Sequence, residues 1–139
     1  RDVARILVTH HPLFALPVGD TGELGKAIGR QELALDAIAD AGVDLLLAGH
    51  NHRASTHSAR DLATRAGAAL VIQAGTATSV RLRDEEQSFN RIDIDGGRVT
   101  LTIQAWNGHE FVSGDEQTYA REGDHWRLAK HPVVPEKAD

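Results

Sequence analysis

The sequence predicts an α/β fold in which a parallel strand-helix-strand unit is followed by an antiparallel hairpin. In the first half, an apolar run at 3–9, an amphipathic helical pattern at 31–42 and a second apolar run at 43–48 follow one another. That order implies a right-handed parallel crossover. In the second half, two runs that alternate apolar and polar residues flank a turn at 95–97, which is typical of a hairpin.

The first strand is predicted from the run VARILVT, which extends from Val3 to Thr9 and ends at the letters HHP. Its apolar, β-branched residues are typical of a strand buried on both faces. The next stretch, 13–30, is rich in Gly and Pro, so we expect a long irregular connection with a short helical turn near 24–28. Long loops inside compact domains are usually functional.

The crossover helix is predicted from apolar and small residues at helical spacing. Leu35, Ile38, Ala39 and Gly42 stand at i, i+3, i+4 and i+7, and Gly42 lies where a left-handed C-terminal cap is expected. The residues at 43–48 then read as a short buried strand.

The second half begins with another buried strand, ALVIQAG at 69–75. The hairpin that follows alternates Ile92 and Ile94 with polar residues on its first strand and Val99, Leu101 and Ile103 with threonines on its second, which predicts one wet face. After residue 107 the chain is polar with sparse apolar anchors. We therefore expect a single domain over 1–139, with its core at about 3–106 and with edge strands and a tail at 107–139.

The start of the chain is unusual for a complete protein. The strand pattern is under way by the third residue, and no Met precedes it. On this ground alone, two explanations stay open: a segment of a longer protein, or a processed but complete domain.

Composition excludes several classes of function. The 139 residues are 41% hydrophobic and 25% charged, which is typical of one soluble globular domain. The absence of Cys excludes disulfides, thiolate zinc sites and cysteine nucleophiles. A net charge of -5 and a pI near 5.9 argue against nucleic acid as a stable partner. The apolar runs are too short to span a membrane, so we expect a cytoplasmic protein with no membrane partner.

Histidines follow two of the predicted strands. His10 and His11 end the first strand, while His50 and His52 follow the strand at 43–48, after Gly49. Ligands of open α/β sheets gather at the carboxyl ends of parallel strands. Gly49 would permit a tight turn with an unusual φ, so that both of the later imidazoles face one cleft. Because neutral imidazole is a common ligand for zinc, iron and manganese, the pattern favours a metal site.

Simpler explanations compete with the metal site. A lone His after a strand is most often a surface residue, although a GHxH turn is harder to explain in that way. The segment at 75–78 could bind a phosphate through amides and hydroxyls, but a plain turn fits it better, because it matches neither phosphate-binding pattern. The other histidines lie in polar stretches and are expected to be solvated: His57, His109, His125 and His131.

The elements VTHHP, LLLAGHNH, VIQAGTATS and SFNRIDID together resemble the C-terminal half of the calcineurin-like metallophosphoesterases, in particular the bacterial branch that includes cyclic-nucleotide phosphodiesterases. The resemblance covers about residues 3–106, and GHxH is its most specific element. It implies a four-layer α/β/β/α sandwich with two metal ions, of manganese, iron or zinc. Carried over, His10 and His50 would bind one ion and His52 the other. His11 would face the substrate in a catalytic role or stand behind a ligand, and a register shift of one residue would exchange His10 and His11.

The chain also departs from that family. The motifs D-x-H, G-D-x-x-D and G-N-H-[DE], which supply the bridging carboxylate and other ligands, precede the HHP strand in the family and are not found here. The resemblance therefore favours the segment explanation: a hydrolase of small-molecule phosphoesters whose isolated C-terminal part has a weak or incomplete metal site, no appreciable activity and a tendency to self-associate. The alternative is a non-catalytic module derived from this fold that binds metal or a partner.

Overall fold

We analysed a computed structural model of the chain. It describes the residues at 3–13, 17–18, 23–24, 29–49, 55–58, 68–78 and 86–129. Within these ranges the fold is mixed α/β, with most elements being strands in two sheets together with one helix. The described part of the chain contains no helix that is long and apolar enough to cross a membrane.

The first sheet, called here the mixed sheet, contains four strands in the order β1-β4-β6-β5. These are β1 (Ile6–Thr9), β4 (Leu45–Ala48), β6 (Leu70–Gln73) and β5 (Ser55–Ser58). β1, β4 and β6 run parallel, whereas β5 is antiparallel to β6. The predicted parallel pairing of the first two buried runs is thus confirmed, and the two strands are direct neighbours.

The second sheet, called here the antiparallel sheet, has the order β10-β9-β8-β7. Its strands are β7 (Ser88–Asp95), β8 (Arg98–Trp106), β9 (Phe111–Glu122) and β10 (His125–Leu128). The predicted hairpin is confirmed, because β7 and β8 pair throughout their length from Ser88 opposite Ala105 to Asp95 opposite Arg98.

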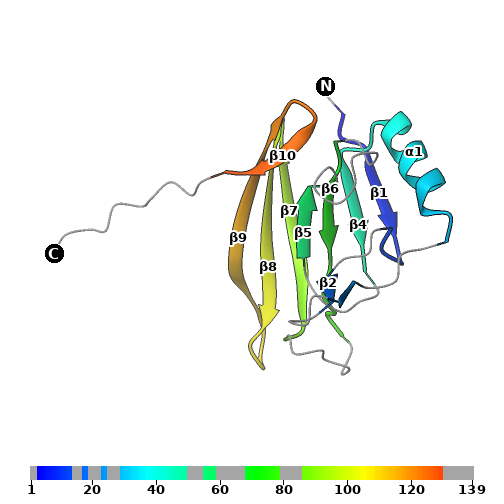
Figure 1. The fold of residues 1–139 in the computed structure, drawn as a ribbon. Helices are drawn as coiled ribbons and strands as arrows, with labels where there is room; N and C mark the ends of the chain where they lie inside the picture. The colour runs from blue at the N-terminus through cyan, green and yellow to red at the C-terminus, as the bar shows by residue number, and fades with distance from the viewer. Residues whose placement is uncertain are drawn as a thin grey trace.

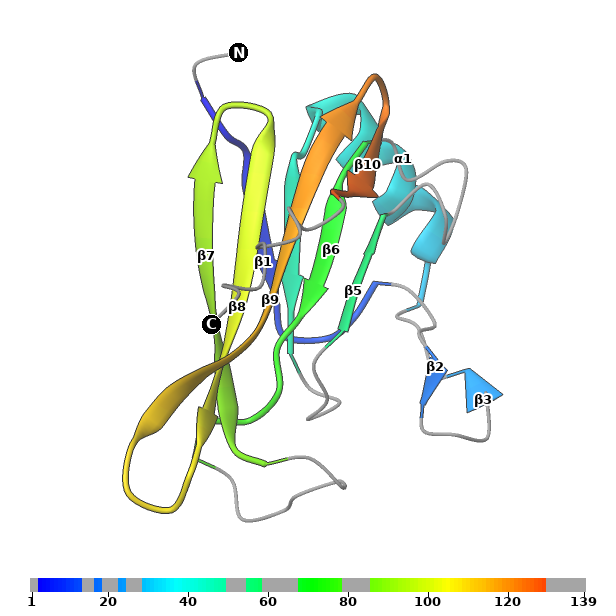
Figure 2. The same cartoon turned by 90° about the vertical axis from the view of Figure 1, so that its left-hand side faces the viewer.

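The two sheets and the helix α1 (Gln31–Ala41) form three layers. α1 lies on one side of the mixed sheet and the antiparallel sheet lies on the other (Figure 1). A small ribbon formed by β2 (Pro17–Val18) and β3 (Glu23–Leu24) lies apart from both sheets (Figure 2). Most of the helical turn that the sequence predicts at 24–28 falls outside the described residues, and Leu24 belongs to β3.

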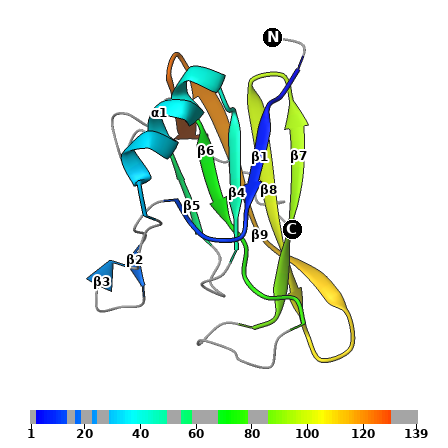
Figure 3. The ribbon, with the colours of Figure 1, turned by 90° about the vertical axis from the view of Figure 1, so that its right-hand side faces the viewer.

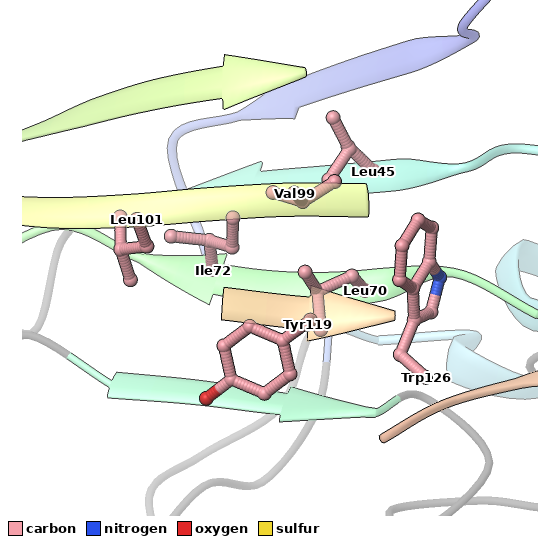
Figure 4. Packing of buried hydrophobic residues seen from close by; sticks show 7 residues of the cluster. All are labelled: Leu45, Leu70, Ile72, Val99, Leu101, Tyr119 and Trp126. Carbon is pink, nitrogen blue, oxygen red and sulfur yellow. The ribbon is translucent and has the colours of Figure 1, made fainter. Parts of the chain in front are cut away.

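Each face of the mixed sheet packs into a separate apolar cluster. Leu35 and Ile38 of α1 pack with Leu46 and Val71, which alternate along their strands with the residues of the opposite face. On the opposite face, side chains of the mixed sheet pack against side chains of the antiparallel sheet in a second cluster. Figure 4 shows its members: Leu45, Leu70, Ile72, Val99, Leu101, Tyr119 and Trp126. The indole Nε1 of Trp126 also donates to the Ala68 carbonyl at 2.8 Å.

The end of α1 follows the sequence prediction. Gly42 adopts the left-handed conformation with φ 62, and its N–H donates to the Ala39 carbonyl at 3.0 Å. Because glycine has no Cβ, it adopts this conformation without the steric penalty that other residues carry. The cap turns the chain directly into β4.

The prediction that the first strand is buried on both faces is wrong. Ile6 and Val8 of β1 are 48% and 70% exposed. β1 is the outermost strand of the mixed sheet (Figure 3), and among the described strands it pairs only with β4. Its apolar composition is therefore that of an internal strand, while its position is that of an edge.

The prediction of edge strands after residue 107 is also wrong in one respect. β9 is twelve residues long and lies inside the antiparallel sheet, between β8 and β10. Most of its side chains are exposed, and Tyr119 is its one buried residue. A strand with one solvated face and few apolar contacts on the other has little hydrophobic alternation, so its sequence resembles a loop.

Candidate metal centre

The carboxyl ends of β1 and β4 lie side by side. Thr9 pairs with Ala48 at the end of the parallel ladder, and the N–H of Gly49 then donates to the His10 carbonyl at 3.3 Å. This hydrogen bond holds the backbone of His10 beside Gly49, and Gly49 directly precedes His50 in the chain. This adjacency follows from a crossover that returns the chain to the neighbouring strand.

His10 and His11 are both exposed and lie next to each other. Their rings meet edge to face, with centroids 4.7 Å apart and an interplanar angle of 90°. The turn that carries them is fixed by Thr9, whose Oγ1 donates to the His11 carbonyl at 2.9 Å. Directly after them, Pro12 and Leu13 are buried, and Leu13 packs into the cluster beneath α1. The buried pair anchors the turn and leaves the imidazoles accessible.

Gly49 does not have the role that the sequence suggested. Its φ lies outside the left-handed region, and a Cβ built on it would meet the His10 carbonyl oxygen at 3.8 Å, which is ordinary van der Waals contact. The backbone at Gly49 continues the parallel pairing instead of turning sharply. The expectation of an unusual φ at this residue was therefore wrong.

The remaining predicted ligands, His50 and His52, lie outside the described residues. Within the described ranges, no group of three or more His, Cys, Asp or Glu side chains is placed to hold a metal ion. The donors that are described, two exposed imidazoles at the carboxyl end of a strand, have the chemistry that zinc, iron and manganese accept. These two imidazoles could supply part of the ligands of a metal ion, and the ion would need further ligands from other residues.

The sequence analysis missed a second group of polar residues near the same edge of the sheets. Gln73 pairs with Ala48 in the same row as Thr9, so the carboxyl end of β6 lies two strands away from His10, about 10 Å at the usual strand spacing. Here Asn90 of β7 faces the mixed sheet, and its Nδ2 donates to the Gln73 carbonyl at 3.4 Å. The alternation of β7 could have revealed it, because Asn90 falls on the same face as Ile92 and Ile94.

Comparison with known proteins adds no assignment. A scan against protein-family models gives no match, and a search of the curated proteins gives none either.

Proposed function

We propose that this chain is the C-terminal segment of a metal-dependent phosphoesterase that hydrolyses small-molecule phosphodiesters or phosphomonoesters. The observation that carries the proposal is the hydrogen bond from Gly49 to His10. It links the HHP element to the first residue of the GHNH element, and these are the two histidine elements on which the resemblance to the calcineurin-like metallophosphoesterases depends.

The proposed fold is the C-terminal half of a four-layer α/β/β/α sandwich. In its support, α1, the mixed sheet and the antiparallel sheet give three layers in the order helix, sheet, sheet. In the longer protein, a second helical layer would cover the outer face of the antiparallel sheet. Exposed Phe89 and Val112 lie on strands of that sheet and would be candidates for contact with it.

The metal ligands in this proposal are His10 and His50 for one ion and His52 for the other. When bound, such ions supply a hydroxide near neutral pH and stabilise negative charge on the phosphoryl oxygens. His11, whose ring lies against that of His10, would orient that ligand or contact the substrate. A cytoplasmic location, where phosphoester metabolites are abundant, is part of the proposal.

The proposed function is tested by hydrolysis of bis-p-nitrophenyl phosphate with manganese, iron or zinc added. We expect no appreciable turnover by this chain, because the bridging carboxylate of the family is not among its motifs. In a longer protein that supplies the D-x-H, G-D-x-x-D and G-N-H-[DE] motifs ahead of Arg1, we expect metal-dependent turnover. In that longer protein, His50→Ala and His52→Ala should each lower turnover by about 100-fold or more, since each removes a metal ligand.

The matched control is His109→Ala. His109 is exposed, and it is held in its turn through its backbone N–H, which donates to Asn107 Oδ1 at 2.9 Å. Its imidazole can therefore be removed without disturbing the turn, and turnover should be unchanged. Full turnover by this chain alone would contradict the incomplete site. Activity retained by both His50→Ala and His52→Ala would contradict the metal assignment and favour a non-catalytic module.

Self-association through β1 is the second part of the proposal. Ile6 and Val8 of β1, and Val3 shortly before it, expose apolar side chains. Among the described strands, β1 pairs on one side only. An exposed apolar edge strand is a template for pairing with another chain. A second copy of this chain offers the same edge, so pairing of β1 with its own counterpart would cover both.

A further inference from the structure

A polar cavity lies between the two sheets, where a sandwich core is normally apolar. Its volume is about 230 Å³. Leu101 and Ile103 of β8 form its apolar wall. Polar residues also line it: Ser55, Thr56 and Gln73 from the mixed sheet, and Asn90, Gln117 and Tyr119 from the antiparallel sheet. None of the described residues that line it is charged.

The polar side chains occupy inward-facing positions of their strands. Asn90 is two residues from Ile92, which packs against the cluster between the sheets. Gln117 is two residues from Tyr119, which belongs to that cluster, and Thr56 pairs with Ile72, which also belongs to it. Because strand side chains alternate between faces, these polar groups point between the sheets. Thr56 and Asn90 are half-buried there, whereas Gln117 is exposed. A half-buried polar side chain is unfavourable unless it is hydrogen-bonded.

Two residues that line this cavity carry a buried acceptor with no donor among the described residues, Asn90 Oδ1 and Gln73 Oε1. The amide of Asn90 must turn its Nδ2 toward the Gln73 carbonyl, because a carbonyl can only accept. This fixes the orientation of the amide. Its Oδ1 is buried and makes no hydrogen bond. A buried acceptor without a donor is costly, which indicates that the site is built to receive one.

Three other polar side chains of the cavity are joined by hydrogen bonds. The Tyr119 hydroxyl donates to Gln117 Oε1 at 2.9 Å and also hydrogen-bonds the Thr56 side chain. In Figure 4 this hydroxyl points away from Trp126, at the other end of the apolar cluster. The pKa of Tyr119 is raised by burial, and the bond from Thr56 lowers it in part. The phenol is thus neutral and held in place, so it forms a wall of the cavity.

We propose that this cavity binds a small uncharged ring compound that donates one N–H or O–H hydrogen bond to Asn90 Oδ1 and packs against Leu101 and Ile103. The volume of the cavity, about 230 Å³, is large enough for one ring, since cavities of about 150 Å³ are sufficient for benzene. The uncharged lining favours an uncharged ligand, because an ion in this cavity would lose its hydration without gaining a charged partner. None of the described residues that line the cavity is a proposed metal ligand.

The proposal is tested with three probes that differ in one feature each: phenol, fluorobenzene and benzoate. Binding is followed by nitrogen–proton NMR of the Asn90 side-chain amide and of the backbone amides of Thr56 and Tyr119. We expect phenol to shift these resonances with a Kd on the order of 1 mM. Fluorobenzene, which has the ring but no donor, should bind about tenfold more weakly. Benzoate, which is charged, should not bind.

Two variants assign the binding to Asn90 and to the cavity. Asn90→Leu removes the acceptor and should equalise the affinities for phenol and fluorobenzene. Ile103→Phe fills the cavity and should abolish binding of both. The matched control is Thr100→Val, which removes a hydrogen bond to Thr118 on the outer face of the same sheet and should keep the preference for phenol.

Three results would overturn the proposal. If phenol at about 10 mM leaves these resonances unchanged, the cavity holds solvent only. Equal binding of phenol and fluorobenzene to the unaltered chain would show that Asn90 Oδ1 is not the recognition group. Undiminished phenol binding by Ile103→Phe would place the ligand elsewhere on the protein. A failure of Asn90→Leu to fold leaves the probe comparison and Ile103→Phe as the decisive measurements.

Discussion

Asp44 joins the two sheets at the beginning of β4, and its removal gives the sharpest stability prediction. Its carboxylate is buried, with a side-chain exposure of 9%. Oδ2 accepts the backbone N–H of Arg5 at 2.9 Å, and Oδ1 accepts the guanidinium of Arg121 on β9. The Arg121 guanidinium in turn lies 5.9 Å from the centre of the Trp126 ring. One carboxylate thereby ties the start of β1 and the end of β9 to β4.

We expect Asp44→Ala to lower the free energy of unfolding by about 2–4 kcal/mol. Breaking a buried ion pair costs about 3–5 kcal/mol, because the remaining charge keeps its desolvation penalty. The Arg121 side chain is 31% exposed, so water compensates part of that penalty. Loss of the acceptor for the Arg5 N–H adds about 1 kcal/mol. The pair Arg91 and Asp93, with side-chain exposures of 57% and 60%, is the matched surface control, and Asp93→Ala should cost about 0.5 kcal/mol or less.

The assay is urea denaturation followed by tryptophan fluorescence, with Asp44→Ala, Arg121→Ala and the double variant measured together. The double variant isolates the coupling between the two side chains, which we expect to be about 1–3 kcal/mol. If Asp44→Ala destabilised the protein no more than Asp93→Ala does, the carboxylate would not be the tie between the sheets. A coupling near zero would attribute the loss to the Arg5 contact alone.

Two further predictions concern Tyr119 and β1. Tyr119 is the only tyrosine in the chain, so ultraviolet titration of tyrosinate reports it directly and should give a midpoint above 10.0, because burial raises its pKa. A folded-state pKa above the unfolded value means that the folded protein binds more protons at high pH, so stability should fall as pH rises above about 10, and Thr56→Val should raise the midpoint further. A midpoint at or below 10 would contradict the burial of the phenol. On the exposed edge, Val8→Lys should weaken concentration-dependent self-association in sedimentation equilibrium, whereas Val112→Lys on β9 should not. An unaltered chain that stays monomeric at all concentrations would refute that interface.

Local sequence patterns were sufficient to predict the helix and the hairpin. α1 ends at Ala41 with Gly42 in the left-handed conformation, as the spacing of Leu35, Ile38 and Gly42 predicts. The hairpin of β7 and β8 follows from alternation on both sides of a turn that contains Gly96, whose φ is 54. Both patterns are governed by residues close together in the chain, and such preferences survive in the folded protein when packing agrees with them.

The errors arose where a distant segment decides the environment. β1 has the composition of a buried strand. Its exposure depends on whether another strand pairs with its outer edge and whether another layer covers its face. The polar sequence after residue 107 predicts edge strands, whereas β9 is a long internal strand because β8 and β10 supply hydrogen-bonding partners on both sides. Backbone pairing stabilises a strand whatever its exposed side chains are, so hydrophobic alternation underestimates it.

For the candidate site, local sequence patterns show which residue types are available and at which strand ends they stand. The sequence places His10 and His11 after one strand and His50 and His52 after another. The roles of all four stay predictions. Two features emerge from the folded chain and not from local patterns: β1 and β4 are direct neighbours joined at His10 and Gly49, and the inward face of β7 places Asn90 in a cavity between the sheets. The physical reason is that strand order and the packing of one sheet on another are set by contacts between residues far apart in the chain, to which local periodicity is insensitive.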